Sequence, residues 1–254
     1  MINDSLEFTH NGVHSSQLGI INVNVEGGLF DEVFMASKTI RETTIVGRHK
    51  PYFQGVEYSP LTFPITLYFE NGYTSDSIRE VARTLCTDYY APLIFSKNTE
   101  RIFFATFVDE GRLVHNGCNE GYITLTVRCN SPFTYSHIID SPEHHVKNEG
   151  LIEFVNNGDL PIKPQITIYK VGKGSLSIKN LSNHDEPFVF DELEDKEIVY
   201  IDNEEEEIET NLPLTYRYDN FNEQFLEMER GVNRLLVTGS CVIKITYQFI
   251  FLNG

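Results

Sequence analysis

Short stretches that favour β-strands follow one another along the whole chain, and this succession restricts the fold more than any single motif. Most stretches alternate apolar and polar residues or are rich in Val, Ile, Thr, Phe and Tyr, with turn-forming residues between them. A mainly β protein is therefore predicted. The expected strands are 21–25, 33–36, 43–46, 62–69, 93–96, 102–108, 122–129, 151–156, 166–169, 175–179, 187–190, 197–201, 208–210, 234–238 and 241–251.

A β-hairpin is expected near the start of the chain. The stretch SLEFTHNGVHSSQLGI, residues 5–20, places Asn11-Gly12 between two short strand-like segments. Asn and Gly both adopt positive φ readily, and the commonest two-residue hairpin turn requires positive φ at both positions. The chain is therefore expected to reverse direction at this pair.

One segment, residues 74–90, has the period of a helix instead of a strand. Its apolar residues recur at i, i+3, i+4 and i+7 and are Ile78, Val81, Ala82 and Leu85. Thr74 or Ser75 is the expected N-cap, and Asp76 in the first turn suits the helix dipole. Pro92 disfavours helical backbone at the residue before it, so the helix is expected to end ahead of Ala91.

The 254 residues suffice for one large β domain or for two ordinary ones. After Ser131-Pro132 comes a polar stretch, and we interpret residues 136–150 as a linker. This gives an N-terminal domain at 1–135, made of a β-sheet with one helix, and a C-terminal domain at 151–254. Several short strands separated by polar turns predict a β-sandwich for the second domain.

The formal charge of −17 is unevenly distributed. Residues 1–135 carry 10 Lys and Arg against 15 Asp and Glu, and residues 136–254 carry 10 against 22. Such a surface repels DNA and anionic lipid at long range, so neither is expected to bind tightly. The chain shows no leader with an apolar core and no apolar run of about 18 residues, so folding in the cytoplasm without membrane insertion is expected.

No motif predicts a catalytic, cofactor or metal site, and the chain is not expected to be an enzyme. The four cysteines lack CxxC spacing, and the side chains of the adjacent His144 and His145 would face opposite sides of a strand. The acidic run 202–209 lacks the glycine-centred alternation of an EF-hand, so a solvated turn is preferred over Ca²⁺ chelation. A glycan hydrolase using two of the many carboxylates remains the last alternative.

Residues 37–60 combine basic and aromatic side chains within an acidic protein. They include Lys38, Arg41, Arg48, His49, Lys50, Tyr52, Phe53 and Tyr58. The segment is either a contact surface or a solvated hairpin whose aromatic rings cover the core of its own domain.

Three parts of the sequence resemble the distal tail proteins of siphophages, which are phages with long non-contractile tails. The first is NGVHSSQLGI at 11–20 with NVEGG at 24–28. The second is GYITLTVRCNSPFTYS at 121–136 with NNGDLPIKPQITI at 156–168. The third is MERGVNRLLVTGSCVIKITYQF at 228–249. Their order along the chain is more specific than any one of them.

The resemblance implies an N-terminal split-barrel domain that forms a hexameric ring around a channel, followed by a galectin-like β-sandwich. It implies a scaffold that joins the tail tube protein to the tail-tip hub or to a tail-associated protein of the baseplate, and possible contact with a receptor-binding protein, while DNA passes through without tight binding. The family location is the virion tail tip, with assembly in the bacterial cytoplasm. A loop completes the ring in this family, and residues 37–60 are the matching segment. The expected interface residues are Arg48, Tyr52, Phe53 and Tyr58, because Arg and Tyr anchor contacts well.

The alternative function is a galectin-like adhesion module that binds host cell-wall glycan. Sugars commonly stack on aromatic rings, and the chain contains no Trp. The aromatic residues that could replace Trp in the second domain are Phe188, Tyr200, Tyr216 and Tyr218.

Overall fold

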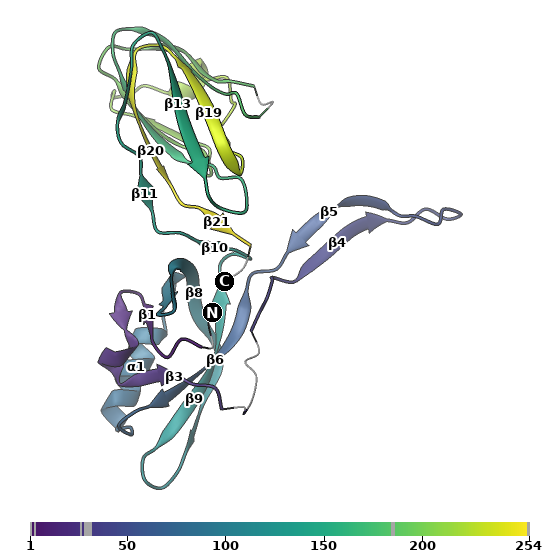
Figure 1. The fold of residues 1–254 in the computed structure, drawn as a ribbon, viewed down its shortest axis with the longest axis vertical. Coiled ribbons are helices and arrows are strands. Elements are labelled where there is room, and N and C mark those ends of the chain that lie inside the picture. Colours follow the sequence, from purple (N-terminus) through teal and green to yellow (C-terminus); the bar gives the residue numbers. More distant parts are fainter. Residues whose placement is uncertain (1, 3, 26, 28–31, 184–185, 253–254) are drawn as a thin grey trace. The chain divides into compact units, whose positions relative to one another are not determined.

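The protein folds into two compact, mainly β units. The computed structural model describes residues 2, 4–25, 27, 32–183 and 186–252, and one α-helix lies among them. The first unit contains residues 1–135 and 251–254, and the second contains residues 136–250. The chain therefore enters the second unit after Tyr135 and leaves it after Ile250 (Figure 1). The predicted mainly β fold is confirmed.

The N-terminal unit is built on one antiparallel sheet that curls into a half-barrel. Its strands follow the order β2-β1-β7-β8-β9-β6-β3, and the short strands β10 and β21 pair beside this path. Their bounds are β1 (Phe8–His10), β2 (Val13–His14), β3 (Ile20–Asn22), β6 (Thr62–Phe69), β7 (Ala91–Phe95), β8 (Asn98–His115), β9 (Gly121–Cys129), β10 (Thr134–Tyr135) and β21 (Ile250–Phe251).

Alternation along the strands forms the core of this unit. In β6, Phe63, Ile65, Leu67 and Phe69 are buried, and the residues between them are exposed or half-buried. The predicted hairpin is also present, because Asn11 and Gly12 have φ of 50° and 78° and join β1 to β2. The 3₁₀ helix η1 (Ser15–Leu18) follows β2.

Helix α1 (Ser75–Leu85) begins where the sequence predicted and ends earlier. The Thr74 side chain accepts a hydrogen bond from the Ser77 amide, and Ser77 returns one to the Thr74 amide. Val81 and Leu85 are buried against the sheet core, whereas Ala82 is exposed. The prediction to residue 90 was too long, because residues 86–90 are needed to lead the chain into β7 at Ala91.

Two expectations for the first unit were wrong. Residues 33–36 form no strand, and residues 44–46 belong to a turn. The strand beside that turn is β4 (Lys38–Thr43), which pairs with β5 (Tyr52–Tyr58). Part of the NVEGG motif, Glu26 and Gly28, lies outside the described residues.

The C-terminal unit is a β-sandwich of two antiparallel sheets. One sheet has the order β11-β20-β14-β17-β18, with β12 also paired to β20, and the other has the order β13-β19-β15-β16. The bounds are β11 (Ile139–Asp140), β12 (His144–Val146), β13 (Glu149–Asn156), β14 (Gln165–Lys170), β15 (Gly174–Asn180), β16 (Phe188–Leu193), β17 (Ile198–Asp202), β18 (Glu207–Thr210), β19 (Gly231–Thr238) and β20 (Cys241–Tyr247).

The inner faces of both sheets form one hydrophobic core. Ile166 and Ile168 of β14 meet Ile178 of β15 and Val237 of β19 in this core, and all four are almost fully buried. Each strand contributes every second residue, which is the pattern expected for a sheet with one covered face.

Residues 136–150, predicted as a linker, are part of the sandwich. Strands β11 and β12 pair with β20, and β13 begins at Glu149. The Asp140 carboxylate accepts hydrogen bonds from Lys244 Nζ at 2.8 Å and Thr246 Oγ1 at 2.6 Å. The polar composition misled the prediction, because the edge of a distant strand supplies these residues with backbone partners.

Candidate functional site

Strands β4 and β5 form a two-stranded antiparallel ribbon of their own, and we call residues 38–58 the arm (Figure 1). Every side chain of β4 is exposed, and so are most of those in β5. A two-stranded hairpin without a covering layer is marginally stable in water. The exposed apolar side chains of the arm are therefore in contact with solvent instead of a hydrophobic core.

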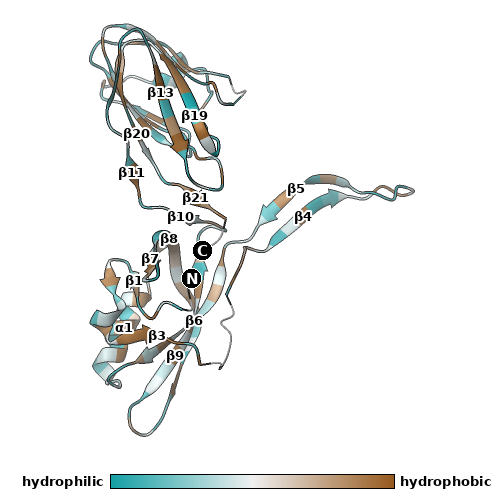
Figure 2. Cartoon of the chain, in the orientation of Figure 1, coloured by the Kyte–Doolittle hydropathy of each residue, from teal (hydrophilic) through white to brown (hydrophobic). Residues whose placement is uncertain are grey.

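The strand register gives the arm two chemically different faces. Ile40 lies opposite Val56, and the neighbouring pairs on that face are Lys38 with Tyr58 and Glu42 with Phe53. The other face carries Arg41 and Glu57, which form an exposed ion pair. Figure 2 shows β4 as mostly hydrophilic and β5 as a mixture of hydrophobic and hydrophilic residues. One face of the arm thus carries an apolar stripe, formed by Ile40, Phe53, Val56 and Tyr58 and flanked by Lys38 and Glu42.

The arm contains all four residues that the sequence predicted for a subunit interface. The Arg48 guanidinium lies over the Tyr52 ring, 4.0 Å from its centroid. The Phe53 side chain is 68% exposed. Tyr58 packs against Phe133 with the ring centroids 5.7 Å apart. Within the described part of the chain, Tyr58 is the one of these aromatic residues whose ring contacts a ring outside the arm. Tyr52, Phe53 and Tyr58 are all exposed, so they do not cover the core in the way the hairpin alternative supposed.

The tip of the arm is also apolar. Val46 is fully exposed, and Gly47 has φ of 88°, a left-handed conformation that glycine adopts without strain. The Arg48 amide donates to the Ile45 carbonyl at 3.0 Å and closes the turn. Two apolar side chains, Ile45 and Val46, are therefore presented beside a positively charged stretch.

In the C-terminal unit, one proposed glycan residue lies inside the protein. Phe188 is 1% exposed, and its ring packs against Phe190 and Phe221 at 5.3 and 4.8 Å. Its assignment as a sugar contact was wrong, because the inward face of β16 is covered by the second sheet. Tyr200 lies half-buried on the outer face of β17, opposite Glu209.

Tyr216 and Tyr218 are the only two of the proposed glycan residues that the structure brings together. Their ring centroids are 5.0 Å apart. The Tyr218 hydroxyl donates to the Glu206 carbonyl and accepts from the Ile208 amide, both at 2.9 Å. This hydroxyl therefore covers part of the free edge of β18 and fixes residues 211–218 beside the acidic turn 204–207.

The same loop carries a leucine in an unusual conformation. Leu214 has φ of 58°, and its side chain is fully exposed. Left-handed backbone costs a non-glycine residue roughly 1–2 kcal/mol. The surrounding structure must therefore stabilise this loop strongly enough to retain the strain.

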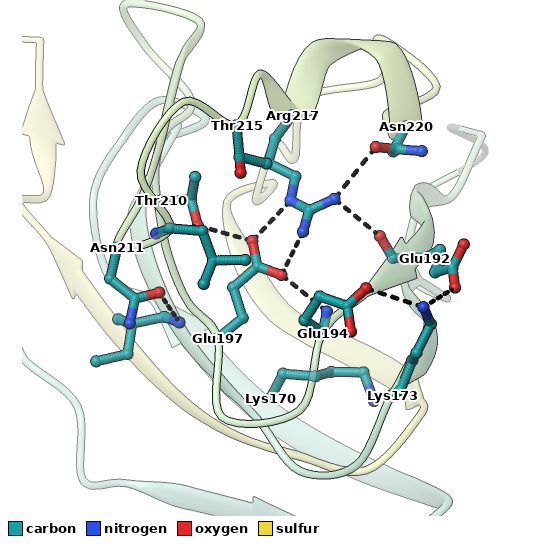
Figure 3. A network of polar contacts seen from close by, with 12 residues as sticks. Lys170, Lys173, Glu192, Glu194, Glu197, Thr210, Asn211, Thr215, Arg217 and Asn220 are labelled. Carbon is teal, nitrogen blue, oxygen red and sulfur yellow. Dashed lines mark hydrogen bonds and ion pairs between the residues drawn. The ribbon is translucent and has the colours of Figure 1, made fainter.

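A buried ion pair supplies that stabilisation (Figure 3). Arg217 Nε and Nη2 each donate to one oxygen of Glu197 at 2.6 Å, and the Glu197 side chain is fully buried. Thr210 Oγ1 and the Glu194 amide also donate to this carboxylate, at 2.7 and 2.8 Å. Burial alone would raise the pKa of Glu197, but the hydrogen bonds from Arg217, Thr210 and the Glu194 amide outweigh it and lower the pKa.

Sequence reasoning missed this pair, because the two residues are 20 positions apart and nothing in their spacing links them. Arg217 also donates to the Glu192 carbonyl and to Asn220, so it ties the 3₁₀ helix η2 (Arg217–Asn220) to the end of β16. Beside it, Lys173 pairs with Glu192 and Glu194 on the surface. The network is therefore a structural anchor whose polar groups are satisfied.

Neither a metal centre nor a membrane span is found among the residues that the structure describes. No group of three or more His, Cys, Asp or Glu side chains there could hold a metal ion, so the acidic turn 204–207 forms no such cluster. No helix in the same residues is long and apolar enough to cross a membrane.

The fold of the whole chain has a known counterpart. The chain is similar in structure to the Dit (gp 19.1) protein of phage SPP1, described as a paradigm of the hub adsorption apparatus in phages that infect Gram-positive bacteria. The TM-score is 0.73 with 15% identity, and the match covers 96% of this chain and 98% of that chain. The chain therefore shares the fold of this phage hub protein.

Sequence comparison gives the family. Residues 3–131 match the family model described as phage tail protein N-terminal domain, and residues 133–247 match the one described as phage tail C-terminal domain. The chain is 34% identical to the SPbeta prophage-derived protein YomH of Bacillus subtilis strain 168, over 99% of this chain and all of YomH. The chain belongs to this phage tail protein family, and the resemblance to distal tail proteins is confirmed.

Proposed function

We propose that this phage tail protein forms a hexameric ring at the tip of a long non-contractile tail and joins the tail tube to the tail-tip hub. The observation that carries the proposal is the arm, a ribbon with an exposed apolar stripe in a chain with the fold of a tail hub protein. The arm of each copy contacts the next copy. Such a head-to-tail contact makes a closed ring when its rotation closes and a filament when it does not.

The energetics favour the arm as the contact element. Full burial of an aliphatic or aromatic side chain is worth about 1.5–3 kcal/mol. Ile40, Phe53 and Tyr58 are each about half exposed or more. Covering the stripe therefore supplies several kcal/mol for assembly without changing either folded core.

The acidic surface suits a channel through which DNA passes. A chain with a net charge of −17 offers few cations to pair with phosphates, so DNA moves past the ring without being held. The proposed partners are other copies of the chain, the tail tube protein, the tail-tip hub and a receptor-binding protein. Assembly takes place in the bacterial cytoplasm.

A glycan-binding function has less support. Phe188 is buried, and the Tyr218 hydroxyl already bonds to two backbone groups of the chain. Only Tyr216 of the four proposed aromatic residues offers a largely exposed ring.

The proposal is tested by light scattering and negative-stain imaging of the purified chain, alone and co-expressed with the tail tube protein of the same phage. Six chains of 29.2 kDa each, about 175 kDa, and ring-shaped particles are expected. Replacing Ile40 and Phe53 with Ser should weaken assembly by about 100-fold or more, because two apolar contacts are lost.

The matched control is Val114→Ser, which changes a 51% exposed residue on β8 in the same unit. It should assemble like the unaltered chain. A mass of one chain under both conditions contradicts the ring, and unchanged assembly of the arm variant contradicts the role of the arm.

A further inference from the structure

The C-terminal unit has a surface patch that combines apolar side chains with dense negative charge. The patch consists of Leu214, Tyr216, Tyr218 and the four glutamates of the turn 204–207, and we call it the acidic patch. All four glutamates are exposed, Leu214 is fully exposed and Tyr216 is 65% exposed. Tyr218 connects the two parts through its hydrogen bonds to Glu206 and Ile208.

The patch is held in a fixed shape. The Glu197–Arg217 pair anchors the end of the loop, and the Asn211 side chain accepts a hydrogen bond from the Ile198 amide at 2.9 Å at its start. Between these anchors Leu214 is held in left-handed backbone with its side chain in solvent. Strained, exposed residues that the surroundings hold in place are characteristic of contact sites.

The chemistry of the patch specifies its partner. Exposed glutamates next to an apolar side chain favour a segment that combines Lys or Arg with a small number of apolar residues. The tip of the arm has this composition. Residues 43–56 carry Arg48 and Lys50 next to Ile45 and Val46, and they contain no Asp or Glu.

We propose that the acidic patch of one copy receives the tip of the arm from a neighbouring copy, an inference that rests on the proposed ring and names the surface that closes it. Ile45 and Val46 pack against Leu214 and Tyr216, while the 204–207 carboxylates face Arg48 and Lys50. The two surfaces differ, so each copy donates one arm and receives another, as a closed ring requires.

Disulfide cross-linking between two variants tests this contact directly. One full-length chain carries Val46→Cys and the other carries Leu214→Cys, and the exposed Cys86 and Cys118 are replaced by Ser in both. The control pairs the Val46→Cys chain with a Leu151→Cys chain, because Leu151 is 58% exposed and lies on the other sheet of the sandwich. We expect the 46–214 product to exceed the 46–151 product by about tenfold on mixing. Equal yields overturn the proposal.

Charge reversal gives an independent test by light scattering. Replacing Glu205 and Glu206 with Lys should weaken assembly by about 100-fold, because like charges then face each other. The control replaces Glu143 and Glu149, two exposed acids of the same unit, with Lys. Adding Arg48→Glu and Lys50→Glu to the patch variant should restore assembly. Failure of this combined variant, with both control and unaltered chains assembling, overturns the contact.

The two proposals fail in different ways. Rings that form normally despite reversal of the patch, but not after loss of Ile40 and Phe53, leave the arm in its role and remove the patch as its receptor. A chain that stays single under every condition and gives no preferred cross-link overturns both.

Discussion

The two units bury polar side chains of different kinds. Among the described residues of the N-terminal unit, the buried polar residues are uncharged, as in Ser5, Asn22 and Thr134, or have a pKa shifted towards the neutral form, as in His10. In the C-terminal unit the ionisable residues Lys170, Glu197 and Arg217 are buried. Burying a charge costs several kcal/mol in desolvation, so the second unit depends on the Glu197–Arg217 pair and its hydrogen bonds to a degree that the first does not.

The difference shows how each unit holds its exposed segment. The arm leaves the first unit as a ribbon whose two strands bond to each other, and no buried charge fixes it. The loop 211–218 is bound to its unit by the Glu197–Arg217 pair at its C-terminal side. The arm is therefore suited to adapt to a partner, whereas the loop presents a fixed surface.

Breaking the buried ion pair should cause the largest loss of stability. It is therefore the strongest test of the contrast between the two units. Glu197→Gln leaves the Arg217 guanidinium buried without a counter-charge, and loss of one partner from such a pair costs about 3–5 kcal/mol. Chemical denaturation, followed by hydrogen exchange in each unit, should show the loss in the second unit.

The matched control for this change is Lys173→Met. Lys173 pairs with Glu192 and Glu194 on the surface, where solvent screens the ion pair, so this change should reduce stability far less than Glu197→Gln. Equal destabilisation by the two variants would show that burial of the charge is not what matters.

Removing a neutral buried group from the first unit should reduce stability by a smaller amount. Asn22 Nδ2 donates to the Ile2 and Ser5 carbonyls, both at 3.0 Å, and the residue is 2% exposed. Asn22→Ala removes the buried donor that both carbonyls share and should cost about 1–3 kcal/mol in denaturant titrations. The exposed Asn71→Ala is the control and should change stability by about 0.5 kcal/mol or less. A loss as large as that of Glu197→Gln would remove the contrast between the units.

A change of pH should have the smallest effect on stability. As the pH falls, the first unit should lose stability before the second. Burial lowers the pKa of His10 from 6.5, although a hydrogen bond with the Ala105 carbonyl opposes the shift. The unfolded chain then binds the proton more readily, so the first unit loses stability as pH falls below 6.5. Glu197 has its pKa lowered from 4.5, so its contribution is present above 4.5 and is lost only at lower pH.

Hydrogen exchange at pH 7, 5.5 and 4 measures this order. Burial also lowers the pKa of His144 in the second unit, so every chain compared carries His144→Leu. In that background, protection in the first unit should decrease first, and His10→Leu should remove most of that early decrease. If the second unit loses protection first, groups other than His10 and Glu197 control the acid response.

Several elements could be predicted because their cause is local. Thr74 caps α1 through an amide three residues away, and Asn11-Gly12 turns the chain with two adjacent φ angles. The alternation in β6 was predicted at its observed bounds. The same reasoning failed for residues 136–150, whose strands exist because β20 lies beside them.

The candidate sites divide in the same way. Clustering of Arg48, Tyr52, Phe53 and Tyr58 followed from their closeness in sequence, since a single hairpin contains them all. Phe188 and Tyr216 are both aromatic residues of the second half, yet one is buried and the other exposed. Local patterns did not distinguish them, because burial depends on which face a distant strand covers.

By itself, the sequence determined the strand-rich character of the chain, its capped helix, its first hairpin and its uneven charge, since each depends on residues a few positions apart. The tertiary structure decided which aromatic residues face inward, how the polar stretch joins the sandwich, and that Glu197 meets Arg217. Those outcomes depend on pairing between segments that are far apart in the chain. Burial makes the free energy of such contacts large, but the spacing of residues in the sequence does not predict which segments will meet.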